Sequence, residues 1–179
     1  NYYFALIFTA LGITITANTW NFIDGLNGLS SGMAVLVLFG YLILLSQNQI
    51  HQLTEFIIII ILSIIPFLII NVFTGRLFLG DGGAYFLGSL IGWIGVEITN
   101  INEAISPWNI FLIIIYPATE LVFSFSRRIF NRKSPVHDDA LHLHSLLYRQ
   151  LMKFKNPSKS FSINNISSLI LLFYGSIPV

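Results

Sequence analysis

The chain has 179 residues, of which 55% are hydrophobic and only 9% are charged, with a formal net charge of +1. Soluble domains carry about 25% charged residues. This composition therefore excludes an ordinary soluble enzyme, a disordered tail and a nucleic-acid-binding domain, which needs a basic surface. The sequence contains no cysteine, which excludes disulfides, zinc thiolates and a thiol nucleophile.

Apolar runs long enough to cross a membrane recur along the chain. A spanning helix needs about 20 mostly apolar residues; five segments qualify, and a sixth begins near Phe161 and is cut short by the end of the sequence. We predict an all-α, polytopic transmembrane helix bundle with five complete spans and a truncated sixth. Pro66 and Pro117 are expected to kink their helices. The five spans are Tyr2–Ala17, Leu29–Ser46, Leu53–Val72, Ala84–Thr99 and Trp108–Phe125.

The lysine and arginine residues can all be placed on one side of the predicted membrane. Arg76 follows the third span, and the other eight lie between the fifth and sixth spans. The positive-inside rule makes this side cytoplasmic, and with it residues 18–28 and a long loop over residues 127–160. Leucines with near-helical spacing predict a short helix around residues 140–151 of that loop. The expected location is the cell (inner) membrane, with several passes.

The chain begins without Met, and both of its ends lie in apolar runs. We therefore expect residues 1–179 to form a single integral-membrane domain that is the C-terminal portion of a larger protein.

Four polar side chains follow the first span. Asn18, Asn21 and Asp24 recur every three residues and share one face if the stretch is helical, and Asn27 continues the series. Two glycines in the same stretch permit a tight turn and close approach of a ligand. A helix cap accounts for any one of these residues, but four amide or carboxylate groups within ten residues favour a binding site.

Asp81 stands between glycines, just before the fourth span. A glycine-rich turn that opens a helix suits a phosphate. A carboxylate in that place opposes a phosphate unless a cation lies between them, so Asp81 is a better Mg²⁺ ligand than a direct phosphate contact. For Asp81 alone, a simple helix cap remains an equal alternative.

His142 and His144 lie in the long loop, after a group of basic residues. With Asp139 they are candidate metal ligands, since neutral imidazole suits Zn²⁺; with the upstream arginines they are candidate ligands of phosphate oxygens. Alternate residues on a helix do not face each other. We therefore expect the pair on an extended or turn segment before Ser145, with both rings pointing at one ligand.

Glu120 is an ionisable residue inside the fifth predicted span, which is a functional hypothesis by default. It lies seven residues before Arg127, about 10 Å along a helix. It either reaches the site or pairs with an arginine. Glu97, nearer the outer surface, is expected to snorkel.

Three segments resemble the motifs of the polyprenyl-phosphate N-acetylhexosamine-1-phosphate transferase family. Residues 21–28, NFIDGLNG, are similar to its N-x-x-D-G-x-(D/N)-G motif. Residues 78–84, FLGDGGA, are similar to F-(M/L)-G-D-x-G-(S/A), and residues 139–144, DALHLH, to D-x-x-H-x-H. Their order, with two spans between successive motifs, also matches. The third motif favours the O-antigen-type branch over the muramoyl-pentapeptide branch.

The resemblance implies transfer of an N-acetylhexosamine 1-phosphate from a UDP-sugar to polyprenyl (undecaprenyl) phosphate, with release of UMP. This reaction starts a cell-envelope polysaccharide, such as that of lipopolysaccharide or the cell wall. The implied cofactor is Mg²⁺, for which Mn²⁺ can substitute. The expected partners are the polyprenyl phosphate lipid, the UDP-N-acetylhexosamine, the membrane and a second copy of the chain in a homodimer, with no nucleic acid. The family also has an aspartate pair in an earlier cytoplasmic loop, which supports the expectation of a C-terminal portion.

The resemblance also assigns roles to residues of this chain. Asp81 and Asn21 are expected to hold Mg²⁺, Asn27 to face the uridine, and Asp24 to shape or polarise the same pocket. The cytoplasmic arginines and the two histidines are expected to hold diphosphate oxygens. The candidate catalytic residues are Asp24, Asp81, His142 and His144, and the candidate substrate-binding residues are Asn18, Asn21, Asn27, Arg76, Arg127, Arg128, Arg132 and Asp139.

Two other classes of protein remain as alternatives. A transporter places polar residues near the bilayer midplane on several spans, whereas the second and third predicted spans are almost wholly apolar there. A zinc-dependent membrane hydrolase is a second alternative, built on His142, His144 and Asp139. Such a hydrolase would work with Zn²⁺, whereas the transferase requires Mg²⁺ or Mn²⁺.

Overall fold

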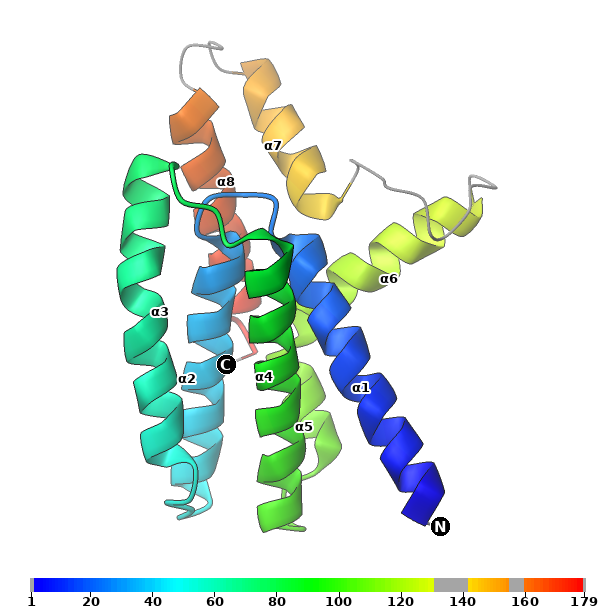
Figure 1. The fold of residues 1–179 in the computed structure, drawn as a ribbon. Coiled ribbons are helices and arrows are strands. Elements are labelled where there is room, and N and C mark those ends of the chain that lie inside the picture. Colours follow the sequence, from blue (N-terminus) through cyan, green and yellow to red (C-terminus); the bar gives the residue numbers. More distant parts are fainter. Residues whose placement is uncertain (1, 131–141, 155–159, 179) are drawn as a thin grey trace.

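The computed structural model describes residues 2–130, 142–154 and 160–178, and within these ranges every regular element is a helix. The first four helices, α1 (Tyr2–Ile23), α2 (Leu29–Gln47), α3 (Thr54–Thr74) and α4 (Gly80–Ile101), alternate in direction. The α1–α2 and α3–α4 connections therefore lie at one end of the bundle, beside α7, and the α2–α3 and α4–α5 connections lie at the other (Figure 1). We call these the motif end and the opposite end.

The fifth predicted span is broken. Helices α5 (Pro107–Ile113) and α6 (Ile115–Phe130) are bent by 76° relative to one another. Pro117 accounts for the position of the break, because it has no N–H for the carbonyl of Ile113 and its ring clashes with that carbonyl. The kink expected at Pro117 is thus confirmed. In contrast, α3 continues as one helix through Pro66.

Two more helices follow at the motif end. Helix α7 (Leu143–Phe154) confirms the short helix predicted around residues 140–151, and α8 (Ser160–Gly175) corresponds to the predicted sixth span. The fifth span was predicted to end near Phe125, and the first residues of the predicted cytoplasmic loop over residues 127–160 are helical in the structure. Helix α6 runs on to Phe130, because arginine is a good helix former and suits the last turn of a helix.

Four of the described helices, α1 to α4, are each long and apolar enough to cross a membrane, and the bent α5–α6 pair would make a fifth span. Many large apolar side chains are exposed on them, for example Phe8, Ile59 and Phe86. A surface of this kind is stable only in lipid or against other apolar segments. The predicted polytopic helical bundle is therefore confirmed.

Helices α1 and α4 approach closely through the small residues of α4. A β-carbon added at Gly88 would lie 2.7 Å from the α-carbon of Ala17, and one added at Gly92 would lie 3.2 Å from the β-carbon of Thr16. Small residues of this kind let helix backbones pack in a membrane. This contact brings the end of α1 beside the start of α4, where two of the three motifs lie.

Candidate functional site

The first and second motifs meet through a side-chain contact. Nδ2 of Asn21, in the last turn of α1, donates to Oδ1 of Asp81 at 3.0 Å. Asp81 lies in the first turn of α4, not in a turn before the helix as expected, because α4 already begins at Gly80. Gly80 has a φ of +66°, a conformation that glycine adopts without strain, and this allows the chain to reverse into the helix there.

Asp24 follows directly after α1 and is half-buried. Burial raises the pKa of its carboxyl from 3.8 to about 6, and the negative charge of Asp81 adds to this rise. The two carboxyl groups therefore share one electrostatic environment. A cation between them would favour the ionised form of both.

The loop between α1 and α2, residues 24–28, is held by asparagines from other helices. Oδ1 of Asn71 in α3 accepts a hydrogen bond from the backbone N–H of Gly28 at 2.5 Å. Oδ1 of Asn164 in α8 accepts from the backbone N–H of Asn27 at 2.8 Å, and Oδ1 of Asn165 lies 3.5 Å from Nδ2 of Asn27. Because these bonds come from α3 and α8, the position of the 24–28 loop depends on two other, separate parts of the chain.

A small polar cavity of about 150 Å³ lies against this loop. It is lined by Asp24 and Asn27 from the loop, by Asn71 and Phe78 from the α3–α4 region, and by Asn164 from α8. The cavity joins the first two motifs and offers amide and carboxylate groups to a ligand.

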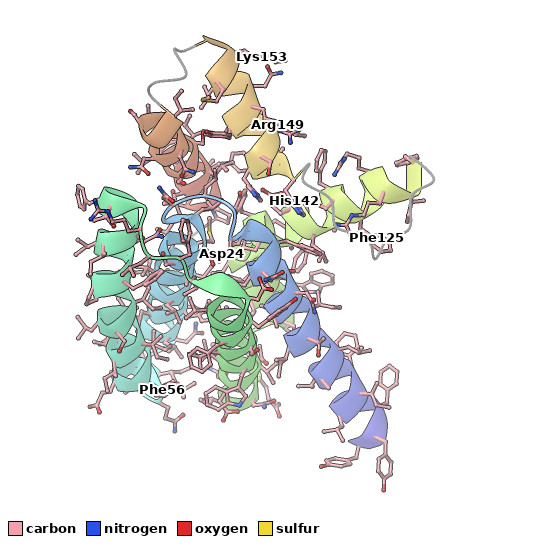
Figure 2. The ribbon with its side chains drawn as sticks, turned by 45° about the horizontal axis from the view of Figure 1, so that its top comes forward. Asp24, Phe56, Phe125, His142, Arg149 and Lys153 are labelled. Atoms are coloured by element: carbon pink, nitrogen blue, oxygen red, sulfur yellow. The ribbon has the colours of Figure 1, made fainter. Side chains whose placement is uncertain are left out.

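The third motif reaches the same place through α7, whose position Figure 2 shows beside Asp24. His144 is only 2% exposed, and its ring packs on Gly25, where an added β-carbon would lie 2.2 Å from Nε2 of the imidazole. The first and third motifs are therefore in direct contact. The tight turn that the sequence predicted at a glycine of this stretch is found at Gly28, which has a φ of +74°.

The expected arrangement of the two histidines was wrong in two respects. His144 lies inside α7, and only His142 precedes the helix. The rings do not converge on one point but stack in parallel, with centroids 5.3 Å apart and planes 5° from parallel. The prediction that the pair is not displayed on one helix holds for His142, but α7 begins at Leu143 and so includes His144.

The stack continues beyond the histidines. The ring of Phe22 lies 5.3 Å from that of His142, and the guanidinium of Arg128 lies 5.6 Å from the centroid of Phe22. Nδ1 of His142 is 2.8 Å from the hydroxyl oxygen of Ser124. A column of Arg128, Phe22, His142 and His144 thus joins α6, α1 and α7.

The remaining candidate residues lie in different settings. Asn18 donates to the backbone oxygen of Thr14 in its own helix, at 2.8 Å. Arg76 is exposed on the α3–α4 loop, and Arg127 is half-buried in the last turn of α6. Arg132 and Asp139 lie outside the described residues. Arg149 and Lys153 are exposed on α7 (Figure 2).

An apolar groove of about 830 Å³ lies between α1 and the bent α5–α6 pair. Its lining includes Ile15 and Trp20 of α1 and Ile115 and Val122 of α6. The groove exists because the break near Ile114 turns α6 away from α1's direction (Figure 1). Two lining residues, Trp20 and Ser126, directly precede Asn21 and Arg127 in the sequence, so the groove ends beside the site.

Comparison with known proteins agrees with these motifs. The sequence profile of glycosyl transferase family 4 matches residues 1–99, which is more than half of the chain.

The chain belongs to glycosyl transferase family 4.

Several curated relatives share the same name. An undecaprenyl-phosphate alpha-N-acetylglucosaminyl 1-phosphate transferase of Yersinia pestis is 29% identical over 151 residues, which cover 82% of this chain and 41% of the relative. The protein of that name from Thermotoga maritima is 29% identical over 149 residues, covering 83% of this chain and 45% of the relative. The one from Escherichia coli K12 is 28% identical over 151 residues, with 82% and 41% covered. The chain thus spans about two fifths of the length of the curated relatives it matches.

Sequence reasoning missed several residues that build the site of this family member. Asn71, Asn164 and Asn165 position the 24–28 loop, and Ser124 contacts His142, next to the contact of His144 with Glu120, which the sequence had suggested. A usable signal existed for Ser124, because it lies four residues after Glu120 on a predicted helix. The asparagine pair at the start of the last apolar run was a second signal.

Proposed function

We propose that the full-length protein transfers an N-acetylhexosamine 1-phosphate from a UDP-sugar to a polyprenyl phosphate, releasing UMP. The observation that carries this proposal is the meeting of three distant motifs at one end of the bundle. Asn21 contacts Asp81, and His144 packs on Gly25. The names of the curated relatives support the same reaction class.

The reaction exchanges one phosphoanhydride bond for another. An oxygen of the polyprenyl phosphate attacks the phosphorus next to the sugar, a new P–O bond forms, and the P–O bond to UMP breaks, with the electron pair leaving on UMP. Asp24 and Asn27 line the small polar cavity, which suits the nucleoside part of the donor. His142, with Arg127 and Arg128 nearby, is placed to hold phosphate oxygens.

The donor groups at the site fit Mg²⁺. Mg²⁺ is commonly held by one or two carboxylates together with substrate phosphates, and carboxylate and amide oxygens are the hard ligands it prefers. Asp81 and Asn21 would hold the ion, which when bound neutralises charge on the diphosphate. Within residues 2–130, 142–154 and 160–178, no three carboxylate or histidine side chains are grouped to hold a metal by themselves.

The acceptor lipid fits the groove between α1 and α6. A polyprenyl chain is wholly apolar, and the groove walls are almost wholly apolar over about 830 Å³. A chain seated there would place its phosphate beside Asn21 and Arg127, where the groove ends. Inside the bilayer the chain would be held by van der Waals packing, because lipid is as apolar as the groove.

We further propose that the motif end faces the cytoplasm, since all lysines and arginines can be placed on that side. The location is then the inner membrane, and the O-antigen-type branch is favoured by the D-x-x-H-x-H form of the third motif. A homodimer stays a prediction.

The test is an assay of the full-length protein in membranes with polyprenyl phosphate and labelled UDP-N-acetylhexosamines, in which lipid-linked product and UMP are scored. Wild-type protein should form both products with Mg²⁺ or Mn²⁺. Asp81→Asn should lower turnover by about 100-fold or more, because losing a ligand to a hard cation removes several kcal/mol of charge stabilisation.

The matched control is Glu103→Gln, which removes an exposed carboxylate at the opposite end and should leave turnover unchanged. Asp81→Asn activity within a few-fold of wild type at saturating Mg²⁺ would show that Asp81 is only a helix cap. Activity that requires Zn²⁺, and stoichiometric zinc that is lost in His142→Ala, would establish the hydrolase instead.

A further inference from the structure

We infer that Glu120 is a positioning residue, which holds the start of α7 and fixes the protonated nitrogen of His144, and through it the orientation of His142. Its effect on turnover rests on the proposed function, whereas its effect on His144 does not.

Glu120 is wholly buried in α6, and donors surround its carboxylate. Oε2 accepts the backbone N–H of Leu143, and Oε1 accepts that of His144, both at 2.9 Å. The hydroxyl of Tyr116 donates to Oε1 at 3.0 Å. The backbone N–H groups of Leu143 and His144 are the first of α7 and have no partner within that helix. Glu120 therefore acts as an N-terminal cap supplied by another helix.

The same carboxylate contacts the imidazole. Nδ1 of His144 lies 3.2 Å from Oε1 of Glu120. A carboxylate that already takes three donors can only accept, so the contact requires a proton on Nδ1. In the neutral ring this leaves the lone pair on Nε2, which faces Gly25. Glu120 thus sets both the place and the tautomer of His144.

Glu120 belongs to a stripe of four buried residues at four-residue intervals on α6: Tyr116, Glu120, Ser124 and Arg128. Residues spaced in this way lie on one face of a helix. Three members contact other elements of the site: Glu120 meets His144, Ser124 meets His142, and Arg128 meets Phe22, while Tyr116 donates to Glu120 within the stripe. The stripe is therefore one surface against which the third motif is aligned.

His142 depends on this alignment through its stacking on His144. The two rings are parallel, and His142 lies between His144 and Phe22. Movement of His144 would remove one wall of the stack. A group that holds substrate phosphates must be preorganised to stabilise charge in the transition state, so loss of Glu120 should lower turnover more than substrate affinity.

The direct test uses the wild-type full-length protein, labelled with ¹⁵N-histidine and held in detergent. The His144 signals are assigned by their loss in His144→Asn. We expect Nδ1 of His144 to be protonated and, in the neutral ring, Nε2 to be unprotonated. A neutral His144 that carries its proton on Nε2 would overturn the inference without any variant at position 120.

The second test compares three substitutions. Glu120→Gln should shift His144 toward the Nε2-protonated tautomer and lower kcat by about 10- to 100-fold, the size typical of outer partners of an active-site histidine, with a smaller change in KM for the UDP-sugar. Glu120→Asp keeps the carboxylate and should recover part of kcat and the wild-type tautomer. Glu97→Gln, which removes a half-buried carboxylate near the opposite end of α4, is the matched control and should change neither.

The readouts separate three results. A purely structural role predicts less folded protein in Glu120→Gln, but unchanged kcat per folded molecule and an unchanged His144 tautomer, and this result would overturn the inference. If the tautomer shifts as expected while wild-type protein makes no lipid-linked sugar, the proposed function fails and the positioning of His144 stands. A shifted tautomer together with the kcat loss supports both.

Discussion

The two ends of the bundle hold their polar side chains in different ways. At the motif end, side chains bond to partners far away in the sequence, as Asn21 does to Asp81 and Glu120 does to the start of α7. At the opposite end, polar groups bond within four residues: Asn48 donates to the Leu44 carbonyl, and Ser106 accepts from the Trp108 N–H.

The difference distinguishes polar side chains that cap their own helix from polar side chains that connect helices at the site. Asn48 and Ser106 satisfy their own helix termini. Asn21 and Glu120 instead tie two helices together, at the cost of ordering several side chains at once. The sequence supplies asparagine and serine at both ends, so residue type alone does not distinguish these roles.

The largest expected difference between the two ends is their access to reagents. In a cysteine-free background, Gln52→Cys should react with a membrane-impermeant thiol reagent added outside intact cells, and Asp81→Cys should react only after the membrane is opened. Both side chains are exposed in the structure. Outside labelling at position 81 would reverse the proposed orientation.

The contact between the first and third motifs gives the next largest effect. Gly25→Ala should displace His144, because the new β-carbon would lie 2.2 Å from Nε2. Overpacking typically destabilises by about 1–3 kcal/mol, and we expect turnover to fall by about 10-fold or more. Gly12→Ala, which meets nothing within 4 Å, is the control. Equal turnover in both variants would show that the His144–Gly25 contact has no role in the reaction.

The asparagines of α8 should matter more than those of the opposite end. Asn164→Ala leaves the backbone N–H of Asn27 without its partner, which costs about 1–3 kcal/mol when the group is buried. Asn164→Asp keeps an acceptor and should restore much of the loss. Asn48→Ala removes only a local bond and should change stability by less than about 0.5 kcal/mol. Thermal unfolding in detergent measures all three, and equal losses at positions 164 and 48 would contradict the comparison.

The smallest effect is a pH dependence at Asp24. Burial raises the pKa of this carboxyl from 3.8 to about 6, so its stabilising contribution is complete below about pH 4 and is lost as the pH rises through 6. In EDTA, Asp24→Asn should therefore be more stable than wild type at pH 8, by on the order of 1 kcal/mol because the group is partly solvated. The gap should close by pH 4. A wild type that is the more stable protein at pH 8 would contradict the assignment.

Much of the architecture follows from the sequence. Apolar length set the spans, proline chemistry set the break before Pro117, and the number of spans between motifs put all three at one end. These features depend on local composition and on the alternation of direction, both of which can be read along one chain. The start of α4 and the end of α6 lie a few residues outside the predicted spans, because the length of an apolar run marks the part of a helix that crosses the membrane and not the ends of the helix.

The features of the site can also be separated into those that the sequence predicted and those that only the tertiary structure decided. The residue types of the three motifs, and the hypothesis that Glu120 reaches them, came from the sequence alone. The tertiary structure alone decided that His144 packs on Gly25, that Asn164 holds the 24–28 loop, and that Glu120 caps α7. Each of these is a contact between residues more than 20 positions apart. The type of a residue does not show which distant residue it will contact. Only the packing of α6, α7 and α8 against the end of α1 fixes which donor meets which acceptor.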